Sequence, residues 1–371
     1  MSDFVVSARK YRPQTFDTVV GQKSITSTLK NAIKQDHLAQ AFLFCGSRGV
    51  GKTTTARILA KTINCFHKTE QIEACDACDS CNSFNEGASL NVYELDAASN
   101  NSVEDIRNLI DQVRIAPQIG THKVYIIDEV HMLSTSAFNA FLKTLEEPPA
   151  HAIFILATTE KHKIIPTILS RCQIFDFNRI KVKDIADHLT FIATKESINA
   201  EAEGLHLIAQ KADGALRDAL SIFDQIVSFA GNNLTYQSVI ENLNILDYDY
   251  YFRIVDFAQK EDIPACLLLY NDIIEKGFDG HHFVVGLADH YRNLLVCKDP
   301  RTSKLLEVGE SVENRFVEQS KIIDSQIILR ALGVLSKTDV DYKASKNHRL
   351  LVELALMQLC SLKNELEKKK D

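Results

Sequence analysis

A glycine-rich loop constrains this chain more than any other feature of its sequence. Residues 46–53 read Gly-Ser-Arg-Gly-Val-Gly-Lys-Thr and stand between a short apolar run and a helical pattern. Glycines at such a turn let backbone N–H groups close around a β-phosphate. With Gly at roughly 7% of residues, the string arises by chance in on the order of one chain in a hundred. It therefore predicts a nucleotide site, in preference to a glycine turn that only caps a helix.

The residues of this loop have separate expected roles. Lys52 is the expected contact of the β and γ oxygens, and the hydroxyl of Thr53 is the expected magnesium ligand. The residues expected to contact the nucleotide here are Gly46, Ser47, Arg48, Gly49, Val50, Gly51, Lys52, Thr53 and Thr54.

A pair of acidic residues supports the nucleotide site. The apolar run 124–127 ends in Asp128 and Glu129. The first carboxylate can hold Mg²⁺, and the second can orient or deprotonate an attacking water. A strand that ends in two acids is common by itself, but together with the phosphate loop it predicts nucleotide hydrolysis.

Short apolar runs alternate with helical periodicity from residue 41 to about residue 177. The runs typical of buried strands are 41–45, 92–95, 124–127 and 153–157. The stretches with helical periodicity between them include 52–64, 103–113 and 136–145. This alternation predicts an α/β domain with a parallel sheet.

Beyond Arg179 the strand-like runs stop. Apolar residues recur there at spacings of three and four, as at Ile185, Leu189 and Ile192, so the remainder is predicted to be helical. A break at 231–233 and a new helical series from about Asp247 divide it. We therefore expect three domains, at 1–179, 180–243 and 244–371.

Composition places the chain among ordinary globular proteins. Its 371 residues are 45% hydrophobic and 25% charged, and no run approaches the roughly 20 apolar residues of a membrane helix. The first ten residues lack the apolar region of a signal peptide, so we expect no membrane association and a cytoplasmic location. The net charge of -7 argues against coating DNA by bulk electrostatics but leaves a local positive groove open.

Four of the nine cysteines lie close together, at Cys65, Cys75, Cys78 and Cys81. Without an export signal, they favour a metal site over a disulfide framework. Four thiolates complete the tetrahedral coordination of Zn²⁺, so we expect a structural zinc site. An iron–sulfur cluster and unliganded thiols remain alternatives, and His67 is close enough to compete as a ligand.

Several strings carry a resemblance to a known family. Besides the phosphate loop and the four cysteines, they are Ala8-Arg9-Lys10-Tyr11-Arg12-Pro13 with Phe16 and Gly21-Gln22, Asp128-Glu129-Val130-His131-Met132-Leu133, Leu145-Glu146-Glu147-Pro148-Pro149, Ser170-Arg171-Cys172 and Gly214-Ala215-Leu216-Arg217-Asp218. On these residues the chain resembles the gamma/tau subunits of bacterial DNA polymerase III, clamp-loader ATPases of the AAA+ class. The resemblance runs from Ala8 to about Leu362 and is densest in roughly the first 225 residues.

The resemblance implies an architecture and further site residues. The α/β domain would be an AAA+ P-loop NTPase domain with a zinc-binding insertion at about 65–81, followed by an all-α lid and an all-α collar that joins subunits. The residues that resemble the family's adenine-side wall are Ala8, Tyr11, Arg12, Pro13 and Val20, with Val19 beside them.

Four residues resemble the groups that sense or stabilise the γ-phosphate. Thr158 and Thr159 are similar to the polar sensor at the end of a strand. Arg171 resembles an arginine finger, which reaches the ATP of the neighbouring subunit and acts there in trans. Arg217 resembles the second sensor, which links the lid to the ATP of its own subunit.

The implied function is to open a sliding clamp and load it onto primer–template DNA, driven by ATP and Mg²⁺. The implied partners are delta and delta-prime type subunits in a ring, the clamp and the DNA, in the cytoplasm at the nucleoid and replisome. The long form in this family continues into segments that bind polymerase and helicase. A chain ending at Asp371 is expected to be a short form, an engineered truncation or a lineage that lacks them.

Two other functions stay open at this point. One is an AAA+ ATPase that remodels branched DNA, which the cysteine insertion and the string at 170–172 disfavour. The other is an assembly scaffold that binds ATP without turnover, which the intact Glu129 disfavours. We see no acidic constellation like that of a polymerase palm, so a polymerase activity would belong to the assembled holoenzyme.

Overall fold

The computed structural model describes residues 5–118, 120–243, 246–302, 305–306 and 308–367. By contacts the chain divides into two compact units, one made of residues 1–197 and 211–225 and the other of residues 198–210 and 226–371. Each unit is described by itself.

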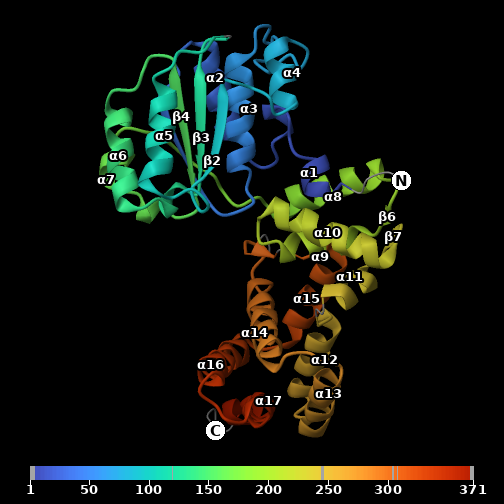
Figure 1. Cartoon of the computed structure of the whole chain (residues 1–371). Coiled ribbons are helices and arrows are strands. Elements are labelled where there is room, and N and C mark those ends of the chain that lie inside the picture. Colours follow the sequence, from blue (N-terminus) through green and yellow to red (C-terminus); the bar gives the residue numbers. More distant parts are fainter. Residues whose placement is uncertain (1–4, 119, 244–245, 303–304, 307, 368–371) are drawn as a thin grey trace. The chain divides into compact units, whose positions relative to one another are not determined.

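The first unit is built on a five-stranded parallel sheet (Figure 1). In spatial order its strands are β2 (Val92–Asp96), β3 (Lys123–Asp128), β4 (Ala152–Thr158), β1 (Ala41–Cys45) and β5 (Gln173–Asp176). In the register Cys45 pairs with Thr158, and Asp96 pairs with Asp128. The carboxyl ends of four strands therefore meet at one edge of the sheet, where the predicted nucleotide residues lie.

Helices cover both faces of this sheet (Figure 1), which is why the inner residues of its central strands are apolar. One core packs α2 (Lys23–Lys34) and α3 (Lys52–Asn64) against Phe42 and Phe44 of β1. The other packs α5 (Val103–Val113) and α6 (Thr135–Glu146) against residues such as Leu43, Tyr125 and Phe154. Helix α5 begins at a capping box formed by Ser102 and Asp105.

Short elements complete the first unit. They are α1 (Ser7–Lys10), η1 (Phe16–Thr18), α4 (Asp79–Asn85), η2 (Val130–Met132), η3 (Lys161–Lys163), α7 (Pro166–Leu169) and α8 (Val182–Lys195). Helix α10 (Leu216–Ala230) starts in this unit, and the division by contacts falls within it.

The described residues of the second unit form helices and one pair of two-residue strands, β6 (Asn199–Ala200) and β7 (Asn233–Leu234). Its remaining helices are α9 (Ala202–Lys211), α11 (Tyr236–Leu243), α12 (Tyr248–Gln259), α13 (Ile263–Glu275), α14 (Gly280–Val296), α15 (Glu310–Ile322), α16 (Ser325–Tyr342) and α17 (His348–Glu367). The core of this unit gathers aromatic side chains such as Phe252, Phe283 and Tyr291. No helix in the described ranges is both long enough and apolar enough to cross a membrane.

The fold class predicted from the sequence is confirmed: an α/β domain with a parallel sheet precedes a mostly helical remainder. Helices α3 and α5 have the predicted bounds. The prediction that strands end before residue 179 is wrong in one detail, because β6 and β7 pair. Two residues are too few to show an alternating pattern. The predicted domain boundary at 243/244 falls beside residues 244–245, which lie outside the described part, and both domain boundaries stay predictions.

Candidate functional site

The predicted phosphate loop joins β1 to α3, and its backbone requires glycine. Gly46, Gly49 and Gly51 all have positive φ, and Gly51 caps α3 in the left-handed conformation. A Cβ at Gly46 would lie 2.6 Å from the backbone oxygen of Phe177. Only glycine therefore fits at residue 46, and the loop leaves the N-terminal amides of α3 directed at a common space.

Lys52 lies within this loop and is 6% exposed. Its ammonium donates to the carbonyl oxygens of Gly46 and Ser47, each at 2.8 Å. Burial lowers the pKa of Lys52, and the nearby carboxylates of Glu129 and Asp128 oppose that change. The buried cation is thus held beside the loop, where a phosphate oxygen can replace the carbonyls as its partner.

The predicted magnesium ligands are in contact. Thr53 donates its hydroxyl proton to Oδ2 of Asp128 at 2.6 Å, and Oδ1 of Asp128 accepts the N–H of Glu129 at 2.9 Å. Glu129 itself adopts the left-handed conformation, with φ of 47°. A non-glycine residue in this conformation is strained, and such strain is common where a side chain must be aimed at a reaction centre.

The two candidate sensor threonines have different partners. Thr159 donates to Oε2 of Glu129 from its hydroxyl at 3.0 Å and from its N–H at 3.3 Å. Thr158 is fully buried, and its hydroxyl lies 3.0 Å from Nδ1 of His131. His131 Nδ1 in turn lies 3.5 Å from Oε2 of Glu129. The sequence identifies His131 only as one residue of a motif shared with the family, because its contact with Thr158 arises from the fold.

The predicted adenine-side residues lie on and after α1. Arg12 donates from Nε to Oγ1 of Thr54 at 3.3 Å, so this segment contacts the start of α3. Tyr11 donates its hydroxyl to Glu196, and burial together with this contact raises the pKa of Tyr11 to about 12. Val19 is buried, whereas Ala8, Pro13 and Val20 are partly exposed.

Arg217 lies in the first turn of α10, next to the phosphate loop. Its Cβ is 3.5 Å from the position that a Cβ at Gly49 would take, and the Cβ of Ala215 is 3.0 Å from it. Gly214 allows this approach, because a Cβ there would lie 2.6 Å from the Cβ of Arg179. The structure therefore places the Cβ of Arg217 beside the loop, and its role as the second sensor stays a prediction.

Arg171 lies elsewhere. Its guanidinium donates to Thr167 O and to Oε1 of Glu146, both at 2.7 Å, and its side chain is 33% exposed. These partners belong to α7 and the end of α6. An arginine finger that acts on a neighbouring subunit has no need of contact with its own phosphate loop.

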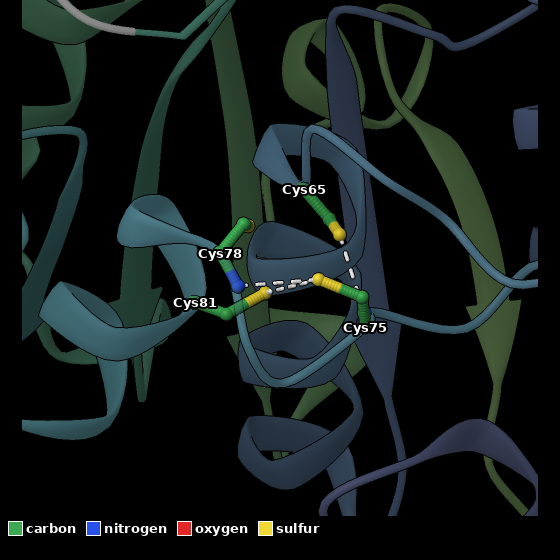
Figure 2. A group of neighbouring side chains, drawn as sticks. All are labelled: Cys65, Cys75, Cys78 and Cys81. Carbon is green, nitrogen blue, oxygen red and sulfur yellow. Dashed lines mark hydrogen bonds between the residues drawn. The ribbon is translucent and has the colours of Figure 1, made fainter.

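The four predicted zinc cysteines converge (Figure 2). Their ligand atoms all lie within 4.8 Å of one another, and the sulfurs of Cys75 and Cys81 are 4.0 Å apart. Tetrahedral Zn–S bonds of about 2.3 Å place sulfurs about 3.8 Å apart, so the set fits one zinc ion. His67 is exposed and lies outside this cluster of the described residues.

Local structure places two of these cysteines at helix ends and favours the thiolate of a third, whereas burial raises the pKa of Cys65 and of Cys81. Cys65 caps the C-terminal end of α3, and Cys78 caps the N-terminal end of α4. The N–H groups of Ala77 and Cys78 lower the pKa of Cys75 to about 6, which favours the thiolate. The Cys75 N–H also donates to the sulfur of Cys65 at 3.2 Å.

Family models cover most of the chain. The model described as "DNA polymerase III, delta subunit" matches residues 21–181. "DNA polymerase III clamp loader subunit, ATPase lid domain" matches 184–232, and "DNA polymerase III subunits gamma and tau domain III" matches 234–371.

Individual proteins agree with these models. The chain is 40% identical to DNA polymerase III subunit tau of Bacillus subtilis over 96% of this chain and 63% of that protein. It is 38% identical to subunit tau of Escherichia coli over 96% of this chain and 55% of that protein. It is 34% identical to subunit gamma of Buchnera aphidicola subsp. Schizaphis graminum over 96% of this chain and 98% of that protein.

The chain thus spans 55–63% of the length of these tau subunits and nearly the whole of that gamma subunit. Among solved structures, the Thermotoga maritima RuvB Holliday junction branch migration motor matches with a TM-score of 0.48 and 18% identity, over 67% of this chain and 78% of that one. The family models and the identities over nearly the whole sequence show that the chain belongs to the gamma and tau family of DNA polymerase III clamp-loader subunits.

Proposed function

We propose that the chain is the ATP-hydrolysing subunit of a clamp loader, which opens a sliding clamp and places it on primed DNA. The observation that carries the proposal is the grouping of Lys52, Thr53, Asp128 and Glu129 at one edge of the sheet, in a chain of this family. These are the groups that phosphoryl transfer to water needs.

In this proposal, each residue of the grouping has one task. Lys52 binds the β and γ oxygens, and the N-terminal amides of α3 receive the phosphates. Thr53 and Asp128 hold Mg²⁺, which neutralises charge on the phosphates when bound. Glu129 orients the attacking water and accepts its proton, and Thr159 holds the Glu129 carboxylate in place.

Two arginines complete the proposed site. Arg217 would contact the γ-phosphate of its own subunit from α10, next to Gly49. Arg171 would contact the ATP of the neighbouring subunit. Its pairing with Glu146 is half exposed, and such surface pairs contribute only about 0–1 kcal/mol. The pairing can therefore be exchanged for a phosphate at small cost.

The four cysteines would hold a zinc ion with a structural role. With four thiolates as ligands, zinc has no open position for water and supplies no catalysis. The helix dipole places partial negative charge at the C-terminal end of α3, so the thiolates of Cys65 and the three other cysteines require a compensating cation.

The proposed partners follow from the family. They are delta and delta-prime type subunits in a ring, the sliding clamp and primer–template DNA, with polymerase and helicase reached through a longer form. The proposed location is the cytoplasm, at the replisome on the nucleoid. ATP would hold the ring in a state that grips the clamp, and hydrolysis would release the clamp closed on DNA.

The experiment is steady-state ATP hydrolysis by the chain assembled with its companion subunits, with and without clamp and primed DNA. We expect clamp and DNA together to stimulate hydrolysis, and Arg171→Ala to abolish the stimulation while ATP still binds. Arg301→Ala serves as the control, because this exposed arginine pairs with the nearby Asp299 on the surface. Hydrolysis that changes neither with clamp and primed DNA nor in Arg171→Ala would refute the proposal. ATP binding without any turnover would favour an assembly scaffold.

A further inference from the structure

One buried carboxylate joins the cysteine insertion to the N-terminal segment. Glu73 stands two residues before Cys75 and is 6% exposed. Its Oε2 accepts the N–H of Phe16 at 3.0 Å, and its Oε1 accepts the N–H of Asp17 at 3.1 Å. Lys30 of α2 lies 2.8 Å from Oε1. Glu73 therefore binds the first two N–H groups of η1, which the helix itself leaves without acceptors.

The backbone around Glu73 is fixed within the insertion. Thr69 N donates to Glu73 O at 2.9 Å, and Glu73 N donates to Oγ1 of Thr69 at 3.1 Å. Ile72 N donates to Thr69 O at 2.9 Å, and Ile72 has a φ of 59°. This tight turn leads directly to Cys75. The position of the carboxylate is thus set by the same loop that presents the cysteines.

The segment that Glu73 holds is attached to the phosphate loop on both sides of η1. Before η1, Arg12 donates to Thr54. After it, Val19 Cγ1 lies 3.9 Å from the position of a Cβ at Gly51. Further on, Gln22 is buried and donates from Nε2 to Val50 O at 3.4 Å and to Asn178 O at 2.7 Å. A shift of η1 would therefore move residues on both sides that line the loop.

We propose that Glu73 is a positioning residue for the nucleotide site and couples zinc binding at the four cysteines to ATP affinity. The inference rests on the proposed function, because it takes the phosphate loop as the ATP site. Zinc fixes the insertion, the insertion fixes Glu73, and Glu73 fixes the segment 12–22. Because coupling between two bound ligands is reciprocal, ATP must then tighten zinc binding by the same factor.

The first test compares two substitutions in the same loop. Glu73→Gln places an amide NH₂ against backbone N–H groups and removes the charge that pairs with Lys30. We expect the Kd for a fluorescent ATP analogue to rise about tenfold, since charge-assisted hydrogen bonds to a buried group are lost. In the assembled ATPase, the KM for ATP should rise while kcat at saturation stays the same. Glu70→Gln changes an exposed carboxylate three residues away and should alter neither the Kd for the ATP analogue nor the KM for ATP.

The second test measures zinc affinity by competition with a chelator, with and without the ATP analogue. The wild-type chain should bind zinc more tightly with the nucleotide, and Glu73→Gln should lose this difference. Lys30→Gln keeps both backbone hydrogen bonds of Glu73, so it should reduce the effect of the nucleotide on zinc affinity by a smaller amount. This variant provides the test if Glu73→Gln fails to fold.

Two results would overturn the inference. One is normal affinity for the ATP analogue in zinc-loaded Glu73→Gln. The other is a wild-type zinc affinity that does not respond to the nucleotide. Absence of nucleotide binding in the zinc-loaded wild type would instead refute the proposed function, so the two failures are distinguishable.

Discussion

The two ends of α3 carry opposite kinds of site. At the N-terminal end, Lys52 and Thr53 are bound by carbonyl and carboxylate oxygens that a nucleotide and its metal can replace. At the C-terminal end, Cys65 joins three other thiols in a set that one ion would satisfy completely. The helix dipole favours anions at the first end and cations at the second. In the proposed function, one helix therefore anchors both a reaction centre, whose groups must exchange partners, and a structural centre, whose groups must not.

The largest expected effect lies at the nucleotide end. Glu129→Gln removes the proposed base but keeps the size of the side chain, so we expect kcat for ATP hydrolysis to fall about 10²–10⁴-fold. ATP affinity and zinc content should not change. Turnover assays and equilibrium binding on the same preparation measure kcat and ATP affinity separately. Hydrolysis at the wild-type rate would remove Glu129 from the mechanism.

The matching change at the cysteine end is Cys81→Ser. Loss of one thiolate ligand should release zinc and lower the free energy of unfolding of the first unit by a few kcal/mol, because zinc binding and folding are coupled. Zinc content and urea unfolding measure this. In the assembled ATPase at saturating ATP, kcat should persist, since no cysteine belongs to the reaction centre. Full stability without zinc would show that the thiols are not metal ligands.

The thiol pKa distinguishes Cys75 of the cysteine cluster from Cys45 beside the phosphate loop. Backbone N–H groups lower the pKa of Cys75 to about 6, whereas burial raises the pKa of Cys45, which directly precedes the phosphate loop, to about 11. A lowered pKa means that Cys75 is mostly thiolate at pH 7, and a raised pKa means that Cys45 remains a thiol until strongly alkaline pH. In zinc-free protein, Cys75 should be alkylated about a hundredfold faster, after allowing for the lower nucleophilicity of the less basic thiolate.

Mass spectrometry of the alkylated peptides over a range of pH measures the rates. The rate at Cys75 should level off above about pH 7, whereas the rate at Cys45 should still be rising at pH 9. Equal rates at the two cysteines at pH 7 would contradict the assigned difference.

The smallest effect is a benchmark for loss of structure alone. Ser102→Ala removes the cap of α5, which should cost about 1 kcal/mol of unfolding free energy. ATP affinity and zinc content should be unaffected, because α5 contributes to neither end of α3. A change in ATP affinity or in zinc content would mean that a loss of global stability, and not local geometry, explains the effects of the other variants.

Local pattern predicted much of the first unit. The phosphate loop, the two acids and the cysteines each carry their information within a few residues, and the structure brings each group together. Helix α3 was placed correctly because its apolar spacing and its glycine N-terminus agree. The sequence predicts no strand at β5 (Gln173–Asp176), because its only two apolar residues are adjacent and too few to form a recognisable strand pattern.

Contacts between distant segments could not be predicted in this way. No spacing rule joins Glu73 to Phe16, or His131 to Thr158, because the fold alone makes these residues neighbours. The roles of Arg171 and Arg217 rested on resemblance, and a lone arginine has no local signature. Glu73 did have a signal that could have been used, a carboxylate within the short loop of cysteines, but its partner was not visible in the sequence.

The most direct test of the account is equilibrium binding of ATP to the wild-type chain and to Lys52→Ala, with Lys34→Ala as a control at the exposed end of α2. The account predicts one ATP per chain, affinity lower by about 10²-fold or more in Lys52→Ala, and no change in Lys34→Ala. Equally tight binding in all three proteins would contradict it, because the nucleotide would then be held somewhere other than the N-terminal end of α3.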